Sequence, residues 1–393
     1  MVEQIAEEEI IIQDHLQNLV NTAPRKKIKN LLLISGGGVS ATFLSMGAIK
    51  CLIENNLFDF DVISSVSGGT IMLHFIEQCY HKGFYKENGW FDKYIRSRLY
   101  EVIKEPIFIK LLLYGMNVEG LTNLSIELFD RFFPDYKDPL DVNKLYKDTD
   151  FRYNYLDANT QHISDNHDDI LNPKKDFYSD NWYFLRLLRC TAPFTNINNK
   201  PSYDAGTSDN NSFSTTFSQF EAENVYLIAA INDFIYKKYK IMNFIDTIAN
   251  LIGAVTNASG KATIHLSEQL AENKNIILCK FSNNLITSND ENHKYLFSNY
   301  YDDVSQLKTY LVGVLFENND MLKVLENEGY IQMHYALKNN KKLKLNKINF
   351  NIPNPDVYNS DVKKIYNDFK KSNLNVDIIK SLYKEFKRKF FKK

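Results

Sequence analysis

Residues 30–38 read Asn-Leu-Leu-Leu-Ile-Ser-Gly-Gly-Gly, a short apolar run typical of a buried strand that ends in three glycines. Residues 61–69 read Asp-Val-Ile-Ser-Ser-Val-Ser-Gly-Gly and repeat the pattern. Apolar residues at helical spacing follow each segment, over residues 42–53 and from about residue 70 to residue 83. Strand, turn and helix in succession, twice, predict an α/β fold with a mostly parallel sheet.

Ser67 stands where the second predicted strand turns into its helix, within Ser65-Val66-Ser67-Gly68-Gly69. Such a turn is sharp, so its neighbours must be small, and it lifts the serine hydroxyl above the sheet. The positive end of the following helix and its free N–H groups favour developing negative charge there. The pattern predicts a nucleophilic serine, although short Ser/Gly patterns also arise by chance.

Two other motifs contain residues that such a serine would need. Gly36, Gly37 and Gly38 allow backbone N–H groups to turn toward one point, which suits an oxyanion hole or an anion cradle. The same glycines also suit a plain strand-to-helix turn. Asp204 begins the sequence Asp-Ala-Gly at residues 204–206, in a polar segment rich in turn residues. It is either the acceptor of an Asx turn or a general base.

Together, and in this order, the three motifs resemble those of the patatin-like phospholipases. Residues 35–41 resemble the glycine-rich loop of that family, residues 65–69 its Gly-x-Ser-x-Gly elbow, and residues 204–206 its Asp-Gly-[Gly/Ala] motif. Three further segments fit the family pattern: Thr191-Ala192-Pro193, Asn210-Asn211 and Glu328-Gly329-Tyr330. The resemblance covers about residues 28–340.

The resemblance implies a patatin-like three-layer sandwich, with helices on both sides of a central, mostly parallel sheet. It implies hydrolysis of lipid acyl esters, as by a phospholipase A or a lysophospholipase. Ser67 would attack the ester carbonyl, and Asp204 would act as its general base. The backbone of Gly36, Gly37 and Gly38 would hold the oxyanion, without a metal or another cofactor. The elbow and acid motifs would comprise Ser65, Gly68, Gly69, Ala205 and Gly206.

Several positions depart from the family pattern. They are Ser65 for the first glycine of the elbow, Ser40 for the basic residue after the glycine loop, Ala41 for the next glycine, Ala205 for the glycine after the acid, and Ser212 for the proline after the asparagine pair. Two other functions therefore stay open. One is a catalytically impaired scaffold that binds lipid or protein, and the other is an acyltransferase. The intact Ser67 and Asp204 favour an enzyme.

Other classes of site fit the sequence less well. A Ser–His–Asp hydrolase needs a histidine near the elbow, but His74 and His81 lie on the helix that leads away from Ser67. No histidine or cysteine spacing matches a metal site. The glycine loop lacks the Gly-Lys-[Ser/Thr] of a Walker loop. The second strand is not followed by the acidic residue that a dinucleotide-binding fold requires.

We divide the chain into an N-terminal helix and link (1–27), a patatin-like catalytic domain (28–340) and a basic C-terminal extension (341–393). Further strands are predicted at residues 151–156, 225–231 and 275–280, and a loop at 162–175. Further helices are predicted near residues 3–21, 91–104, 121–132, 180–191, 242–256, 303–317 and 329–338. The aromatic-rich segment 85–190 lies between the two catalytic motifs and is a candidate lid.

The balanced total charge conceals a basic tail. The chain has 393 residues, of which 47 are basic and 48 acidic. Residues 341–393 hold 15 of the basic and 5 of the acidic residues. Residues 377–393 form a basic amphipathic pattern that suits docking on anionic lipid, at about 1 kcal/mol per basic residue, or a solvated tail. Its membrane-facing candidates are Lys380, Lys384, Lys387, Arg388 and Lys389. The acidic remainder predicts no nucleic-acid partner.

The composition is that of an ordinary globular protein, which excludes a disordered or fibrous chain. Four widely spaced cysteines (Cys51, Cys79, Cys190 and Cys279) fit neither a disulfide scaffold nor a zinc site, and so indicate a reducing, cytoplasmic compartment. No signal peptide and no membrane-spanning run is predicted. With 44 asparagines, and 39 lysines against 8 arginines, the chain reflects AT-rich coding, as in some protists and large DNA viruses.

Overall fold

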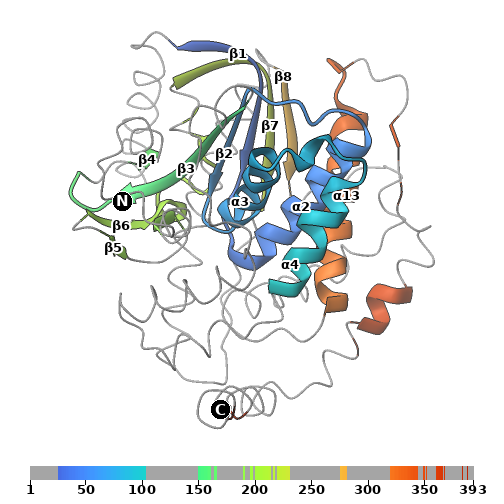
Figure 1. Ribbon diagram of the computed structural model, residues 1–393. Helices are drawn as coiled ribbons and strands as arrows, with labels where there is room; N and C mark the ends of the chain where they lie inside the picture. The colour runs from blue at the N-terminus through green and yellow to red at the C-terminus, as the bar shows by residue number, and fades with distance from the viewer. Residues whose placement is uncertain are drawn as a thin grey trace, which may run out of the picture.

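The computed structural model shows the sheet, the main helices that cover it, and the predicted site (Figure 1). It describes residues 25–102, 149–160, 163–165, 189–190, 195–197, 200–213, 216, 219–230, 275–280, 319–343, 348–349, 351, 360–365, 367, 383 and 387. The helices predicted at 3–21, 121–132, 242–256 and 303–317 lie outside these residues, as do the N-terminal link up to residue 24 and most of the candidate lid. Of the helix predicted near 180–191, only residues 189 and 190 are described, and both are helical. Of the basic amphipathic segment, only Tyr383 and Lys387 are described, and both are exposed.

One mixed sheet forms the centre of the molecule. Its strands are β1 (Lys26–Ile34), β2 (Val62–Val66), β3 (Asp150–Asp157), β4 (Ile163–Asp165), β5 (Thr195–Ile197), β6 (Lys200–Asp204), β7 (Phe220–Ala229) and β8 (Asn275–Lys280). The order is β5-β6-β3-β2-β1-β7-β8, and β4 also pairs with β3. Neighbouring strands in the row β3-β2-β1-β7-β8 are parallel. The strands β4 and β6 are antiparallel to β3, and β5 is antiparallel to β6. The predicted α/β class with a mostly parallel sheet is confirmed.

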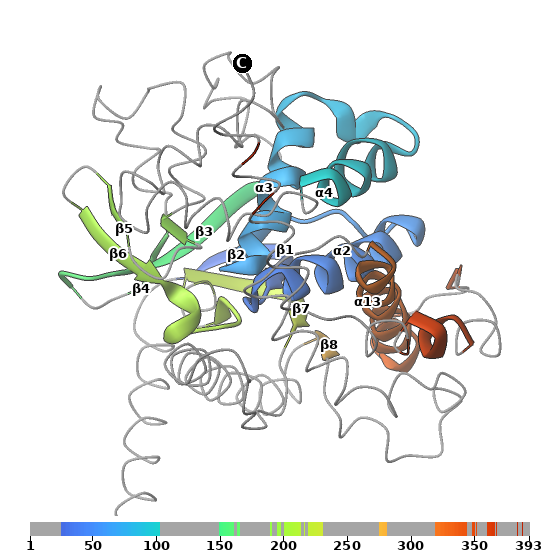
Figure 2. The ribbon, with the colours of Figure 1, turned by 90° about the horizontal axis from the view of Figure 1, so that it is seen from below.

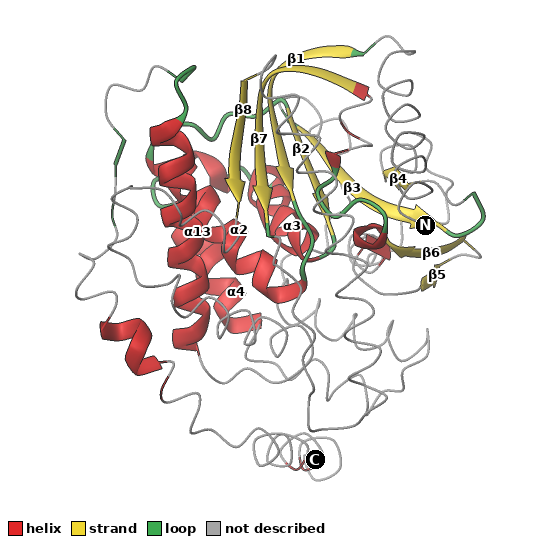
Figure 3. Cartoon of the chain, turned by 180° about the vertical axis from the view of Figure 1, so that it is seen from behind, coloured by secondary structure: helices red, strands yellow, loops and turns green. Residues whose placement is uncertain are grey.

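Helices cover one face of this sheet. They are α2 (Gly38–Glu54), α3 (Gly68–His81) and α13 (Asn319–Asn339). Three short helical segments follow α3 in the chain: η1 (Phe84–Lys86), η2 (Phe91–Arg96) and α4 (Ser97–Val102). The helices α2 and α3 lie in front of the strands in Figure 1 and behind them in Figure 3. Viewed from below, the antiparallel strands β5 and β6 lie at the edge of the sheet opposite β8 and α13 (Figure 2).

The apolar run in β1 is continuous because both faces of the sheet are covered. Leu32 and Ile34 belong to the core shared with α2, α3 and α13. Leu31 and Leu33 alternate with them and belong to a second core on the other face, together with Phe213. All four β1 side chains are fully buried. A strand with only one buried face would instead alternate between apolar and polar residues.

Most of the predicted elements that fall on described residues are confirmed, with shifted ends. β1 begins four residues before the predicted strand, and α13 begins ten residues before the predicted helix at 329–338. The loop predicted at 162–175 is wrong at β4, and the turn predicted around Asp204 is wrong in part because Asp204 ends β6. Both strands are polar and short, and they form because their backbones pair with β3. Such pairing needs no apolar pattern, so periodicity does not reveal it.

A row of asparagine side chains crosses the sheet from Asn30, in the middle of β1, to Asn275, where β8 begins. The amide of Asn224 donates to Asn30 Oδ1 (2.9 Å), the amide of Asn275 donates to Asn224 Oδ1 (2.5 Å), and the amide of Asn340 donates to Asn275 Oδ1 (3.1 Å). Strand register places Asn30, Asn224 and Asn275 side by side. The row therefore joins three parallel strands to the residue that follows α13.

The four cysteines are buried and none of them forms a disulfide, as expected of core thiols. Burial raises the pKa of Cys51 and of Cys79 to about 12, which keeps both in the neutral thiol form. Within the described ranges, no helix combines the length and the apolar character that crossing a membrane requires.

Candidate active site

Ser67 forms a strained turn between β2 and α3, as the elbow motif predicts. Its backbone has φ 49° and ψ −121°, a region that residues other than glycine rarely occupy. The β1–α2 loop lies directly against this turn. A Cβ on Gly68 would come within 2.0 Å of the Gly38 carbonyl oxygen, and one on Gly69 within 2.6 Å of the Ser35 carbonyl oxygen. The small residues after Ser67 are therefore required by the close approach of two backbones.

Strand register brings Asp204 beside Ser67, although 137 residues separate them in the sequence. Val66 is paired with Asn154 on β3, and the next residue of β3, Tyr155, is paired with Asp204 on β6. Ser67 follows Val66, so it lies in the same row across the sheet. Its Oγ donates a hydrogen bond of 2.5 Å to Asp204 Oδ2. The structure thus unites the two residues that the sequence motifs proposed as a dyad.

The Asp204 carboxylate is held at both oxygens. Oδ2 accepts from Ser67, and Oδ1 accepts from the backbone N–H of Gly206 at 2.8 Å. Burial raises the pKa of this carboxyl to about 7, against the lowering effect of those two hydrogen bonds. A carboxylate with a pKa near neutrality is a much stronger base than an ordinary aspartate.

Two departures from the family motifs are accommodated without strain. Ala205 is fully buried in η4 (Ala205–Thr207) and does not have a positive φ, so its position does not require glycine. Ser65 is also fully buried, and its hydroxyl donates to Thr70 Oγ1 at 3.2 Å. Neither substitution displaces Ser67 or Asp204.

The glycine loop provides two candidate oxyanion donors rather than three. The Gly36 N–H donates to the Asn210 carbonyl oxygen at 2.8 Å, so it is not available to a substrate in this conformation. Gly37 (φ 130°) and Gly38 (φ 64°) have backbones that favour glycine. Gly38 is the first residue of α2, where an N–H has no intrahelical acceptor. The inclusion of Gly36 in the oxyanion hole is corrected on these grounds.

Helix α2 also links the glycine loop to the elbow. The hydroxyl of Thr42 donates to the Gly68 carbonyl oxygen at 2.7 Å and lies 3.3 Å from the Gly38 carbonyl oxygen. Thr42 is completely buried, so this contact is shielded from water. The amino-terminal ends of α2 and α3 therefore meet at the site, and both favour negative charge there.

Among the described residues, Ser67 Oγ is hydrogen-bonded to Asp204 and to no histidine. His74 is buried on α3 and contacts Gln78, 3.4 Å away. His334 lies on α13, and the other five histidines apart from His81 lie outside the described residues. Within the described part of the chain, no cluster of three or more His, Cys, Asp or Glu side chains could hold a metal.

The sequence motifs do not include the buried polar residues beneath the elbow, above all Asn154 on β3. Its amide lies 2.9 Å from Ser64 Oγ, from the Ser65 carbonyl oxygen and from Ser212 Oγ. The sequence carries one signal for this cluster, because two adjacent serines interrupt the otherwise apolar β2 strand. Thr191-Ala192-Pro193 lies outside the described residues, and Asn210, Asn211 and Glu328 are buried.

A scan against models of known protein families finds no match to this sequence, and a search of curated proteins finds none either.

Proposed function

We propose that this protein is a serine hydrolase of carboxylic esters with a patatin-like fold, and that its substrates are lipid acyl esters. One observation carries the reaction class: Ser67 Oγ donates a 2.5 Å hydrogen bond to Asp204 Oδ2. Ser67 occupies a strained elbow, and Asp204 has a pKa of about 7 because of burial. The resemblance of the ordered motifs to those of the patatin-like phospholipases supports lipid acyl esters as the substrate class.

In the first half of the reaction, Ser67 Oγ attacks the ester carbonyl carbon while the Asp204 carboxylate accepts the hydroxyl proton. The carbonyl oxygen becomes an oxyanion, which the N–H groups of Gly37 and Gly38 stabilise. The tetrahedral intermediate then collapses. The bond to the alcohol oxygen breaks, and protonated Asp204 returns the proton to the leaving alcohol, leaving an acyl ester on Ser67.

In the second half, a water molecule attacks the acyl-enzyme carbonyl and gives a proton to Asp204. Collapse of this second intermediate breaks the bond to Ser67 Oγ, which takes the proton back from Asp204, and the free acid leaves. An alcohol in place of water would give acyl transfer by the same steps, so the acceptor is identified from the products.

Labelling with a fluorophosphonate probe tests the proposal directly. We expect the wild-type protein, in the presence of phosphatidylcholine vesicles, to be labelled on Ser67, and Ser67→Ala to lose labelling entirely. Ser208→Ala is a matched control, because Ser208 is an exposed serine close to the acid motif and should leave labelling unchanged. A folded wild-type protein that stays unlabelled and releases no fatty acid from phospholipid, lysophospholipid or monoacylglycerol would contradict the proposal.

The raised pKa of Asp204 predicts a pH profile. Only the carboxylate form can accept the Ser67 proton, so the labelling rate should rise about tenfold per pH unit below about pH 7 and level off above it. The rate should be measured from pH 5 to pH 9 at constant ionic strength. Asp204→Asn removes the titrating base, and its residual rate should lack this step. A wild-type rate that is flat between pH 5 and pH 8 would exclude Asp204 as the base.

A further inference from the structure

A cluster of buried polar side chains connects the strand that precedes Ser67 to the segment that follows Asp204. At its centre is Asn154, whose side chain is 1% exposed. Its Nδ2 lies 2.9 Å from Ser64 Oγ and from the Ser65 carbonyl oxygen on β2, and 2.9 Å from Ser212 Oγ beyond the acid motif. A carbonyl oxygen only accepts, so the contact to Ser65 fixes the amide with its NH₂ group facing β2.

The far end of the segment from Asp204 to Ser212 contacts both the glycine loop and β3. The Asn210 carbonyl oxygen accepts from the N–H of Gly36, in the glycine loop after β1. Ser212 Oγ contacts the amide of Asn154, on β3. The segment therefore connects Asp204, at the end of β6, to the glycine loop after β1 and to Asn154 on β3.

Ser212 adopts a backbone conformation that its side chain alone does not favour. It is completely buried with φ 56°, a left-handed conformation that costs a residue other than glycine about 1 kcal/mol. Proline, the residue that the family pattern predicts at this position, has φ fixed near −65° and could not adopt it. The serine hydroxyl that contacts Asn154 is therefore present despite a backbone cost that glycine would avoid.

We propose that Asn154 is a positioning residue that, through Ser212, holds Asp204 at the correct distance from Ser67. The proposal rests on the function proposed above. A buried strand position that served packing alone would be filled most cheaply by an apolar side chain, because a buried amide costs stability wherever it lacks a partner. Asn154 also precedes Tyr155, the β3 residue paired with Asp204, so it adjoins the dyad on the same strand.

Ser212→Gly separates positioning from stability. The change removes the hydroxyl bonded to Asn154 but relieves the left-handed backbone, so thermal stability should stay equal or rise slightly. If the contact positions Asp204, the labelling rate of Ser67 should nevertheless fall about tenfold, since a displacement near 1 Å can cost up to about 10²-fold. The pH midpoint of labelling should also move, because the surroundings of the carboxyl change. A stable variant labelled at the wild-type rate, with an unchanged midpoint, would overturn the proposal.

A pair of asparagine variants provides the matched comparison. Asn154→Ala should slow labelling about 10- to 100-fold and shift the pH midpoint. Asn224→Ala removes an amide that also bridges strands of this sheet, but it does so where β8 begins, whereas Ser67 follows the carboxyl end of β2. It should lower the melting temperature and leave the labelling rate and midpoint of the folded protein unchanged. Equal effects of the two variants on labelling would show that Asn154 acts only through stability.

Amide hydrogen exchange tests the contact between Asn154 and Ser212 without relying on enzyme activity. The N–H of Gly206 donates to Asp204, and that of Gly36 donates to Asn210, so both amides report on the segment. In Ser212→Gly and Asn154→Ala, exchange at these two amides should become at least tenfold faster, while the Asn224→Ala rates stay at wild type. If the wild type is not labelled, the proposed hydrolase fails, but exchange still decides whether Asn154 holds the segment. Unchanged exchange in both variants would refute the positioning role.

Discussion

Replacing Asp204 with asparagine is expected to slow ester hydrolysis by about 10²- to 10⁴-fold and, at pH 8, to make the protein more stable. Asparagine has nearly the same shape as aspartate. Its amide oxygen can still accept from the N–H of Gly206, and its NH₂ group can donate to Ser67 Oγ. The hydrogen-bonded geometry is thus kept, while the proton acceptor for Ser67 is lost.

The gain in stability follows from the sign of the pKa change. Burial raises the pKa of Asp204 from 3.8 to about 7 in the folded protein. Between about pH 4 and pH 7 the unfolded chain therefore releases a proton that the folded protein retains, and stability falls as pH rises. Above pH 7 the buried carboxylate costs on the order of 1–3 kcal/mol, allowing for partial solvent screening. Asp204→Asn removes this cost, so its advantage in melting temperature should appear at pH 8 and vanish near pH 4.

Glu328→Gln is the matched control, because it changes a second buried carboxyl of the same kind. Glu328 lies on α13, where burial raises its pKa to about 7, and it accepts from Gln332. Its neutral variant should show the same pH-dependent gain in melting temperature and hydrolyse esters at the wild-type rate. An Asp204→Asn protein with wild-type hydrolysis would exclude Asp204 as the base. One that is less stable than wild type at pH 8 would show that the carboxylate is not destabilising.

The sequence allows the centre of the sheet and the elbow to be predicted because their chemistry is local. Where a strand is covered on both faces, consecutive residues are apolar, so the apolar runs in β1 and β8 predict strands from the sequence alone. A sharp strand-to-helix turn needs small residues, which makes Ser67 recognisable among neighbouring glycines. The acid motif could be proposed at Asp204 by resemblance. The 2.5 Å contact depends on the register of three strands, which no short segment specifies.

Contacts between distant segments account for what the sequence did not reveal. The N–H of Gly36 looks like an oxyanion donor in the motif, but the carbonyl of Asn210 occupies it. Asn154 is one of 44 asparagines, and only the fold places it between Ser65 and Ser212. The strands β4 and β6 carry no apolar alternation because they are held by backbone pairing at the edge of the sheet. In each case the contacting residue is far away in the chain, so the local sequence pattern does not predict the contact.

Replacing Gly329 with alanine is expected to destabilise the protein by about 2–4 kcal/mol, although alanine favours helix over glycine by about 1 kcal/mol. The reason is the close crossing of α2 and α13. A Cβ on Gly329 would lie 1.9 Å from the Leu44 carbonyl oxygen, and one on Gly47 would lie 1.7 Å from the Glu326 carbonyl oxygen. Because backbone atoms occupy these positions, the extra methyl can be accommodated only by separating the helices.

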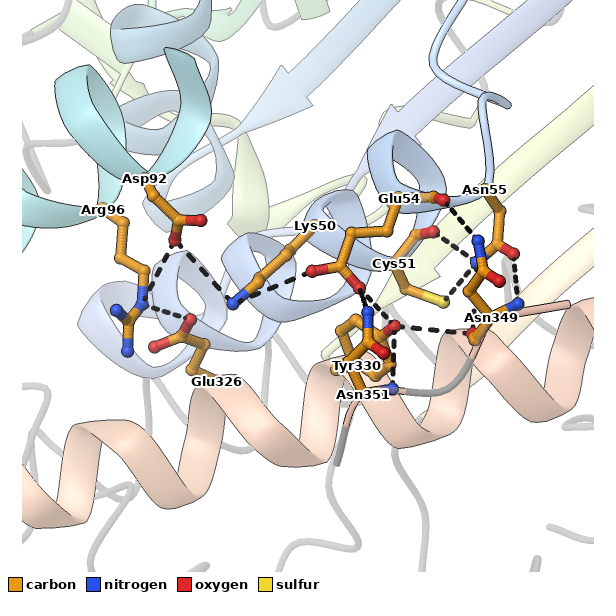
Figure 4. A network of polar contacts seen from close by, with 10 residues as sticks. All are labelled: Lys50, Cys51, Glu54, Asn55, Asp92, Arg96, Glu326, Tyr330, Asn349 and Asn351. Carbon is orange, nitrogen blue, oxygen red and sulfur yellow. Dashed lines mark hydrogen bonds and ion pairs between the residues drawn. The ribbon is translucent and has the colours of Figure 1, made fainter. Parts of the chain in front are cut away.

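Separation would also disturb the polar contacts along the crossing (Figure 4). Tyr330 Oη, on α13, donates to Glu54 Oε2 on α2 at 2.5 Å. Arg96, at the end of η2, donates through Nε to Glu326 Oε1 on α13 at 2.6 Å, and Glu326 is 3% exposed. A partly opened crossing would leave the Glu326 carboxylate buried with a weakened partner, which is more costly than losing a surface ion pair.

Thermal and urea unfolding of Gly329→Ala and Gly47→Ala should both show this loss, and the double variant should lose less than the sum. Each methyl forces apart the same two helices, so the second finds the crossing already open. Gly89→Ala is the control, since no heavy atom lies within 4 Å of its Cβ position. Because Gly89 has a positive φ, the Gly89→Ala protein should lose only about 1 kcal/mol of stability. A Gly329→Ala protein as stable as wild type would mean that the two helices can part without loss, and fully additive losses would mean that they do not share one contact.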